Sequence, residues 1–238
     1  MTGTRSKVFP AVLCLTAATF AVLIYMIFMY APQAQATAGG LAQKIFYFHV
    51  PAAYAMYLCG TVCFLASAAY LVEATDVRNA IAKAGAECAV VFGLMMLTSG
   101  PLWAKKAWGV YWTWDPRLTT TLLSVMVYVA VVVLRAFSGD GDAERKFAAA
   151  LGVLGTVNLP IIHYSVLKWG GNHPTVIGRG GGGLGSPAMR ETLSLGFFAM
   201  TLLAILLVWT RSNVAILSSR LTRAEEEAMA LDPEEDAP

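Results

Sequence analysis

Charged side chains are scarce in this sequence. Asp, Glu, Lys and Arg make up 13% of its 238 residues, whereas hydrophobic residues make up 57% and the mean hydropathy is +0.60. A soluble domain usually carries about 25% charged residues. The deficit excludes an ordinary water-soluble domain and indicates that lipid surrounds much of the chain. The net charge of +2 is small and dispersed among loops, so nothing indicates a nucleic acid as a partner.

Cysteine is also rare. Its four copies, Cys14, Cys59, Cys63 and Cys88, all lie inside apolar runs. We therefore interpret them as small hydrophobic residues, and no disulfide framework is indicated. Cys59 and Cys63 are spaced to share a helix face, but a metal or redox pair there would need further ligands nearby.

Long apolar runs are abundant by contrast. A helix needs roughly 20 apolar residues to cross the hydrocarbon core of a membrane. Six runs reach that length: 8–30, 51–73, 81–102, 119–137, 147–166 and 189–211. They lack the alternation of barrel strands, so we expect helices. The predicted fold class is all-α, a polytopic membrane protein with six transmembrane helices in one bundle.

The first run must be compared with a secretory signal peptide, because Arg5 and Lys7 precede it and the small residues at 34–36 resemble a cleavage site. The apolar part of a signal peptide is only about 7–15 residues long, which is shorter than this run. We therefore expect a retained first helix.

Lys and Arg are distributed unevenly around the predicted helices. With a cytoplasmic N-terminus, ten of them flank the inner side and seven flank the outer side. Cytoplasmic loops usually carry the excess, so both termini are expected in the cytoplasm. The membrane domain is expected to cover 1–222. The acidic residues 223–238 are expected to form a solvated, partly disordered tail.

The longer connections, 31–50, 103–118 and 167–188, all fall on the predicted outer side. Long loops in a compact domain are usually functional or disordered. The last of them contains the glycine-rich run Gly178–Gly185, whose flexibility leaves its geometry open. This run is not a phosphate loop, because it lacks the strand, the helix and the GKT or GKS that such a loop requires.

The three histidines also gather near the outer side. His49 is expected where the second helix begins, His173 in the last outer loop, and His163 about 5 Å from the outer end of the fifth helix. Each can be explained as a helix cap or an interface residue, but imidazole is also a metal ligand and an axial ligand of haem iron. Zinc would need more ligands, and Asp115 and Glu191 are the only acids on this side. Haem brings four nitrogens of its own and needs only two axial ligands.

Aromatic rings are concentrated in the loop region 103–121, "WAKKAWGVYWTWDPRLTTT". Trp and Tyr favour membrane interfaces, and this preference accounts for Trp103. It does not account for the crowding of further rings in the same loop, which are Trp108, Tyr111, Trp112 and Trp114. Flat rings suit a large planar ligand, which they bind by stacking and dispersion.

Charged residues accompany these rings. Lys105, Lys106 and Arg117 are candidates to pair with the carboxylates of a planar ligand, Arg117 in bidentate fashion. Asp115 is expected to order the loop, for instance by pairing with Arg117, rather than to act as an acid.

Three motifs carry a resemblance to a known family. "WGVYWTWDPRLT" resembles the tryptophan-rich WWD signature of the haem-handling proteins of cytochrome c maturation, and "FHVPAAY" and "NLPIIHYSVLKWGGNHPT" match as well. Together with the length and the predicted helices, they resemble CcmC, the haem exporter protein C family of the System I pathway, rather than its longer relatives CcmF and CcsA. The resemblance covers the second to the sixth predicted helix.

This resemblance implies a membrane protein that binds b-type, non-covalent haem and is not an enzyme. The family's axial ligands correspond to His49 and His173, with His163 as a secondary candidate. The residues that correspond to its haem platform are Trp108, Gly109, Tyr111 (where tryptophan is common), Trp112, Trp114, Asp115, Arg117, Leu118 and Trp169. The implied location is the bacterial inner membrane with the WWD loop in the periplasm. The implied partners are the haem chaperone CcmE and, in an ABC-type complex, CcmA, CcmB and CcmD.

Two other functions are compatible with the composition. A b-type electron-transfer cytochrome would hold haem between helices at membrane depth, where only His163 is expected to lie. A solute transporter usually carries charge or broken helices within its spans. Here Glu87 is the only acid within a span, and Asn158 with Pro160 is a candidate kink, although a packing hydrogen bond explains Asn158 more simply.

Overall fold

The computed structural model describes residues 5–35, 39–137, 141–173 and 184–231 of the chain. The elements, in order, are α1 (Arg5–Tyr25), the π-helical turn η1 (Met26–Tyr30), the 3-10 helix η3 (Gly40–Ile45), α2 (Phe46–Val72), α3 (Asp76–Trp108), α4 (Pro116–Phe137), α5 (Asp142–Trp169) and α6 (Pro187–Leu231). Six helical segments are long and apolar enough to cross a membrane, and the described residues contain no strand. The predicted all-α membrane fold is confirmed.

The helices extend beyond the predicted apolar runs. α2 begins at Phe46 rather than at 51, α3 ends at Trp108 rather than at 102, and α5 ends at Trp169 rather than at 166. The last turns of α3 contain Lys105 and Lys106, which favour a helix but lower the hydropathy, so a hydropathy pattern does not detect them. The extra residues of α2 are mostly aromatic and were missed because the predicted run began only at residue 51. His49 therefore lies inside α2 and not before it, which corrects the prediction.

α6 shows the same effect at its C-terminal end. The helix passes position 223 without a break and continues to Leu231. Its last turns, "RAEEEAMAL", are solvent-exposed and consist mainly of strong helix formers. In the tail that was expected to be solvated and partly disordered, residues 223–231 are therefore solvated but helical, and residues 232–238 lie outside the described part of the chain.

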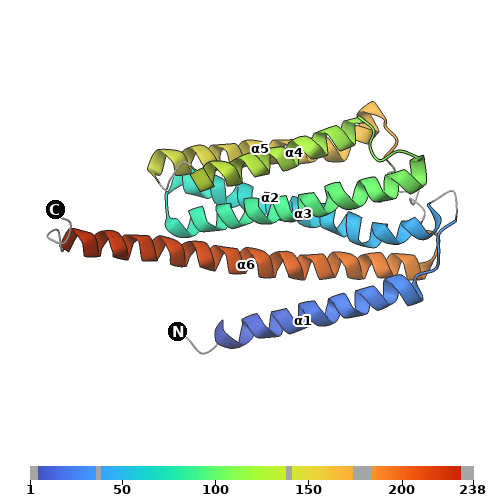
Figure 1. The fold of residues 1–238 in the computed structure, drawn as a ribbon, viewed down its shortest axis with the longest axis horizontal. Coiled ribbons are helices and arrows are strands. Elements are labelled where there is room, and N and C mark those ends of the chain that lie inside the picture. Colours follow the sequence, from blue (N-terminus) through green and yellow to red (C-terminus); the bar gives the residue numbers. More distant parts are fainter. Residues whose placement is uncertain (1–4, 36–38, 138–140, 174–183, 232–238) are drawn as a thin grey trace, which may run out of the picture.

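The main core lies where α2 and α3 pack along each other, with α4, α5 and α6 around them, and α1 packs against α6 at the edge of the bundle (Figure 1). Gly85 of α3 allows the closest approach, because a Cβ added there would lie 2.6 Å from the backbone nitrogen of Cys63. Cys59, Cys63 and Cys88 are buried in this core as free thiols. They pack as small hydrophobic residues, as predicted.

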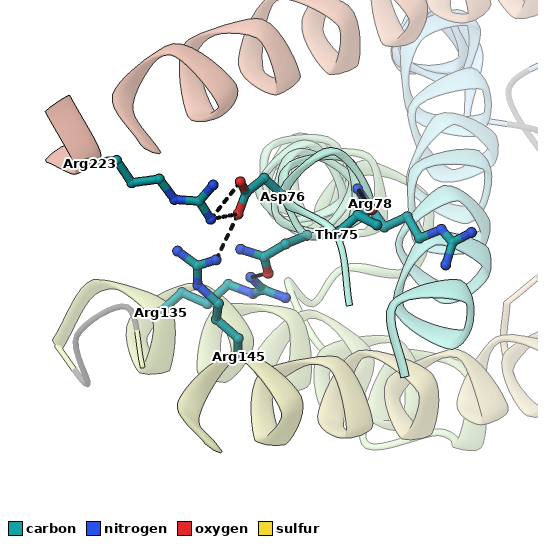
Figure 2. A network of polar contacts seen from close by, with 7 residues as sticks. Thr75, Asp76, Arg78, Arg135, Arg145 and Arg223 are labelled. Carbon is teal, nitrogen blue, oxygen red and sulfur yellow. Dashed lines mark hydrogen bonds and ion pairs between the residues drawn. The ribbon is translucent and has the colours of Figure 1, made fainter. Parts of the chain in front are cut away.

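Both termini lie at one end of the bundle, which we call the terminal end (Figure 1). Asp76, the first residue of α3, accepts from Arg145 of α5 at 3.0 Å and from Arg223 of α6 at 2.7 Å (Figure 2). Arg135 of α4 donates to Asn79 of α3. These contacts tie α3, α4, α5 and α6 together at this end.

The polar residues that pointed to a transporter have structural partners. Glu87 forms an ion pair with Arg211 of α6 at 2.6 Å. The amide of Asn158 donates to the carbonyl of Thr120 and to the hydroxyl of Ser124, each at 2.7 Å. These contacts agree with the simpler interpretation of Asn158 as a packing residue. α5 also continues through Pro160 as one helix.

Candidate functional site

The opposite end of the bundle, which we call the histidine end, carries His49 and His173. His49 lies in the first turn of α2, where its Nδ1 is 3.0 Å from the hydroxyl of Ser99 on α3. Gly100 follows, and a Cβ added there would lie 3.0 Å from Cε1 of the His49 ring. Ser99 and Gly100 therefore form a close-fitting seat for this imidazole on α3.

The aromatic loop is anchored at both ends. α3 ends at Trp108 and is followed by the C-cap Gly109, whose φ of 80° is the left-handed conformation that favours glycine at a helix C-terminus. Asp115 caps α4, because its Oδ1 accepts from the backbone N–H of Leu118 at 2.9 Å and Pro116 occupies the first helical position. Asp115 orders the loop as predicted, but it does so by capping a helix rather than through a hydrogen-bonded pair with Arg117.

The basic residues near the loop differ in their contacts. Lys105 donates to the carbonyl of Gly109 at 2.9 Å and lies 5.3 Å from the ring centroid of Tyr111, so it supports the loop. Lys106 is exposed. Arg117 is directed inward: its Nη1 lies 3.3 Å from Nδ1 of His173, and its Nη2 donates to the carbonyl of His163 at 3.0 Å.

The rings of His49 and His173 lie 6.4 Å apart between centroids, with 33° between their planes. A metal–imidazole nitrogen bond is about 2 Å long. Two such bonds on opposite sides of one metal ion separate the nitrogens by roughly 4 Å, and each ring centroid lies about 1 Å farther out. The expected separation of roughly 6 Å matches the observed one. The pair is therefore spaced for a single metal ion between the rings.

A cavity of about 620 Å³ opens between these residues. Its walls include His49 and His173, the rings of Trp108 and Trp112, Arg117, Leu118 and the secondary candidate His163. Ligand cavities in proteins usually measure about 300–1,000 Å³ and have apolar walls with a few convergent polar groups. Size and composition both fit a large, flat, partly charged ligand.

Several cavity residues were not predicted as part of a site, among them Trp103 and Tyr57. Trp103 was expected only to anchor the membrane interface, but it lines the cavity, packs edge-on against Trp108 at 5.3 Å and donates to Gln43 at 3.2 Å. Tyr57 lines the cavity from α2. It follows His49 by about two helical turns on the same face, a spacing that was visible in the sequence.

Other predicted platform residues lie outside the cavity. The side chains of Trp114, Trp169 and Tyr111 are 76%, 65% and 57% exposed. Trp114 contacts the cavity indirectly, because its ring packs against that of Trp112 at 5.8 Å. The glycine-rich run Gly178–Gly185 falls largely on residues 174–183, which lie outside the described part of the chain.

Several buried polar atoms of this region lack a hydrogen-bond partner among the described residues. They are Nε1 of Trp112, Oγ1 of Thr113, Oδ2 of Asp115 and Nε of Arg117. Buried polar groups are normally hydrogen-bonded, and each unmet one has an energetic cost. Two of these atoms, Nε1 of Trp112 and Nε of Arg117, are donors on residues that line the cavity, so they are available to carboxylates of a ligand, whereas Oδ2 of Asp115 is an acceptor and is not.

Six helices that can span a membrane and a ligand-sized aromatic cavity at one end of the bundle define a polytopic membrane protein with a site for a small molecule. Comparison with known proteins identifies the molecule. The family model described as heme exporter protein C matches residues 1–227. The chain therefore belongs to the heme exporter protein C family, CcmC. Members of this family handle haem in cytochrome c maturation and are not enzymes.

Individual relatives agree with the family model. Heme exporter protein C of Escherichia coli strain K12 is 36% identical over 183 residues, which cover 75% of this chain and 72% of the relative. That of Bradyrhizobium diazoefficiens is 33% identical over 183 residues, covering 76% and 70%. That of Rhodobacter capsulatus is 28% identical over 222 residues, covering 89% and 88%.

Proposed function

We propose that this protein holds haem in the cavity at the histidine end, non-covalently, with His49 and His173 as the axial ligands of the iron. The observation that carries the proposal is the separation of 6.4 Å between the two ring centroids. The pair needs no third protein ligand, since the porphyrin supplies the other four nitrogens. Within the described residues, no cluster of three His, Cys, Asp or Glu side chains competes as a metal site.

The aromatic walls support a planar ligand in particular. The ring centroid of Trp108 lies 6.4 Å from that of His173 and 5.3 Å from that of Trp103, edge-on in both cases. The three rings therefore form a continuous aromatic surface that begins at the proposed axial ligand His173. Trp112 lines the same cavity, and Trp114 extends its ring surface toward solvent. Apolar rings of this kind contribute contact area at a small entropic cost. We assign Trp108, Trp112 and Trp103 to the porphyrin wall.

Arg117 is the residue proposed to bind a haem propionate. Its guanidinium reaches into the cavity and its Nε is buried without a partner among the described residues. An arginine–carboxylate pair is charge-assisted and often bidentate, which makes it stronger than a hydrogen bond to a neutral acceptor. Lys105 is not assigned to a propionate, because its ammonium group supports the loop.

The histidine end is proposed to face the periplasm of a bacterial inner membrane, with both termini in the cytoplasm. The excess of Lys and Arg near the terminal end supports this orientation, as does the arginine-rich network around Asp76. The proposed recipient of haem is the chaperone CcmE, with CcmA, CcmB and CcmD as further components of an ABC-type complex. The exposed rings of Trp114 and Trp169 are available at this end for contact with a recipient.

The proposal is tested with the purified full-length protein. Wild-type protein should yield the absorption spectrum of low-spin haem with two histidine ligands. The double variant His49→Ala, His173→Ala should lose this haem, and added imidazole should restore part of it. His163→Ala is the matched control, because its ring also borders the cavity, and it should retain haem. Full haem occupancy in the double variant would overturn the assignment.

A further inference from the structure

The two cavity histidines differ in the groups that contact their ring nitrogens. A neutral imidazole has one N–H donor and one lone pair, and its hydrogen-bond partners determine which nitrogen carries which. A hydroxyl lies beside Nδ1 of His49, and a guanidinium lies beside Nδ1 of His173. These two partners impose opposite requirements.

Ser99 determines the tautomer of His49. Its hydroxyl lies 2.6 Å from the carbonyl of Met95, one helical turn back, and a carbonyl can only accept. The single hydroxyl proton of Ser99 is therefore donated to Met95. Toward His49, at 3.0 Å, the same oxygen can then only accept. Nδ1 of His49 carries the proton, and its Nε2 holds the lone pair that a metal requires.

The position of His49 is fixed as well as its tautomer. Gly100 contacts the imidazole so closely that an added Cβ would lie 3.0 Å from Cε1. A ligating histidine usually donates its second ring N–H to an oxygen, which holds the ring and raises its basicity. The seat formed by Ser99 and Gly100 matches that arrangement.

Arg117 has the opposite effect on His173. A guanidinium has only donors and stays protonated, so at 3.3 Å it directs an N–H at Nδ1 of His173. The lone pair of this imidazole is then engaged by Arg117. His173 becomes a metal ligand only after Arg117 has moved away from it.

We propose that Ser99 is a positioning residue that makes His49 the retained axial ligand, and that Arg117 makes His173 the exchangeable one by competing for its lone pair. The inference rests on the proposed haem site and specifies which of its two axial histidines is displaced first. A haem propionate offers Arg117 a stronger, charge-assisted partner, so arrival of haem releases His173. If His173 ligates through Nε2, the Nε2 proton leaves to solvent and Nδ1 gains one, so the net charge is unchanged.

Removal of haem follows the reverse order. Withdrawal of the propionate would return Arg117 to His173, and His49 would then be the residue that still holds the haem. A recipient protein could take the place of His173 before His49 is released, so that haem would stay bound throughout its transfer.

The first experiment identifies the retained ligand. Haem-loaded full-length protein is reduced, carbon monoxide is added to replace one axial ligand, and the iron–carbon stretching frequency is measured. The frequency responds to the basicity of the remaining histidine. Ser99→Ala should raise it, because His49 loses the acceptor for its Nδ1 proton, and Ser99→Thr should restore the wild-type value. Thr98→Ala is the control, since this neighbouring hydroxyl bonds only to its own helix and is exposed.

An unchanged frequency in Ser99→Ala protein would overturn the role of Ser99, because His49 would not then be the ligand opposite carbon monoxide. Measurements use only protein that elutes like the wild type. If Ser99→Ala protein does not fold, Ser99→Cys provides the weaker acceptor in its place. Loss of the proposed function is a separate result: the wild type would then take up no haem with two histidine ligands in the first place.

The second experiment tests Arg117. The protein is loaded with haem dimethyl ester, whose esterified propionates offer Arg117 no charge-assisted partner. In the wild-type background, Arg117→Gln should then weaken the apparent affinity for carbon monoxide about fivefold, since one hydrogen bond that holds the displaced His173 is removed. In a His173→Ala background the same change should have no such effect, because no imidazole is left to capture. An equal effect in both backgrounds would show that Arg117 acts on haem alone, and would overturn the competition.

Discussion

The imidazole rings of His49 and His173 lie 6.4 Å apart, although one belongs to the first turn of α2 and the other to the segment that follows α5. Neither ring is held by its own element alone. Ser99 of α3 contacts the first and Arg117 of α4 contacts the second. The pair is therefore a product of tertiary packing, and changes to neighbouring residues can test it while both histidines remain.

Gly100→Ala should reduce haem binding without removing a ligand. The added Cβ would lie 3.0 Å from Cε1 of His49, so the ring must move out of its seat. We expect a loss of haem affinity of roughly tenfold, in line with other changes to the surroundings of a metal ligand. Haem titration of the purified protein measures it. Gly185→Ala is the control, because nothing lies within 4 Å of its added Cβ; equal affinities for the two variants would contradict the seat.

Trp112→Ala and Trp114→Ala should differ, although the two rings touch. Trp112 lines the cavity, whereas Trp114 is 76% exposed. Loss of one aromatic contact of about 1 kcal/mol corresponds to a roughly fivefold weaker retention of haem for Trp112→Ala. The rate of haem transfer to an excess of apomyoglobin reports retention. A larger effect for Trp114→Ala would place the ligand on the outer face of the loop instead.

Asp115→Ala should destabilise the bundle rather than alter the ligand field of the iron. The variant loses the acceptor for the N–H of Leu118, a helix cap that typically contributes about 1 kcal/mol. A lower thermal unfolding midpoint in detergent is the expected result, and Asp115→Ser should recover most of it. If Asp115→Ser remained as unstable as Asp115→Ala, the second carboxylate oxygen would matter more than the cap.

Asp76→Asn should affect stability only. It weakens the contacts with Arg145 and Arg223 at the terminal end, far from the cavity (Figure 2). Because these side chains are partly exposed, the expected cost is about 1 kcal/mol or less, and it should diminish as salt is added. Thermal unfolding at low and high salt measures it, with Asp142→Asn as the control for a fully surface-exposed pair. A changed haem spectrum in Asp76→Asn protein would contradict independence of the two ends.

The sequence was sufficient to predict the number of spans, because each has an apolar stretch long enough to cross the hydrocarbon core. It was insufficient for the helix ends. The last turns of α3 and the end of α6 carry charged residues that hydropathy does not count, and the first turn of α2 was missed because the predicted run began at residue 51. His49 was therefore expected in a loop, although it is held on a helix.

The site was predictable only where its residues share a motif. Trp108, Trp112 and Arg117 lie close in sequence and all line the cavity. The contacts of Ser99 with His49 and of Trp103 with Gln43 join residues that are far apart in the chain. Such contacts depend on how α2 and α3 pack, and no local pattern in either helix encodes them.

The packing of α2 against α3 also gives the site a fixed register. Cys63 follows His49 by 14 residues on α2 (63 − 49), and Ser99 follows Gly85 by 14 residues on α3 (99 − 85). In this antiparallel pair, the contact of Gly85 with Cys63 and the contact of Ser99 with His49 are thus separated by the same number of residues on both helices. Deleting a single residue from either stretch would rotate the contacting face of that helix by about 100° at one of the two contacts. The contact at Gly85, almost four helical turns away in the middle of the bundle, therefore helps to determine where Ser99 meets the proposed ligand His49.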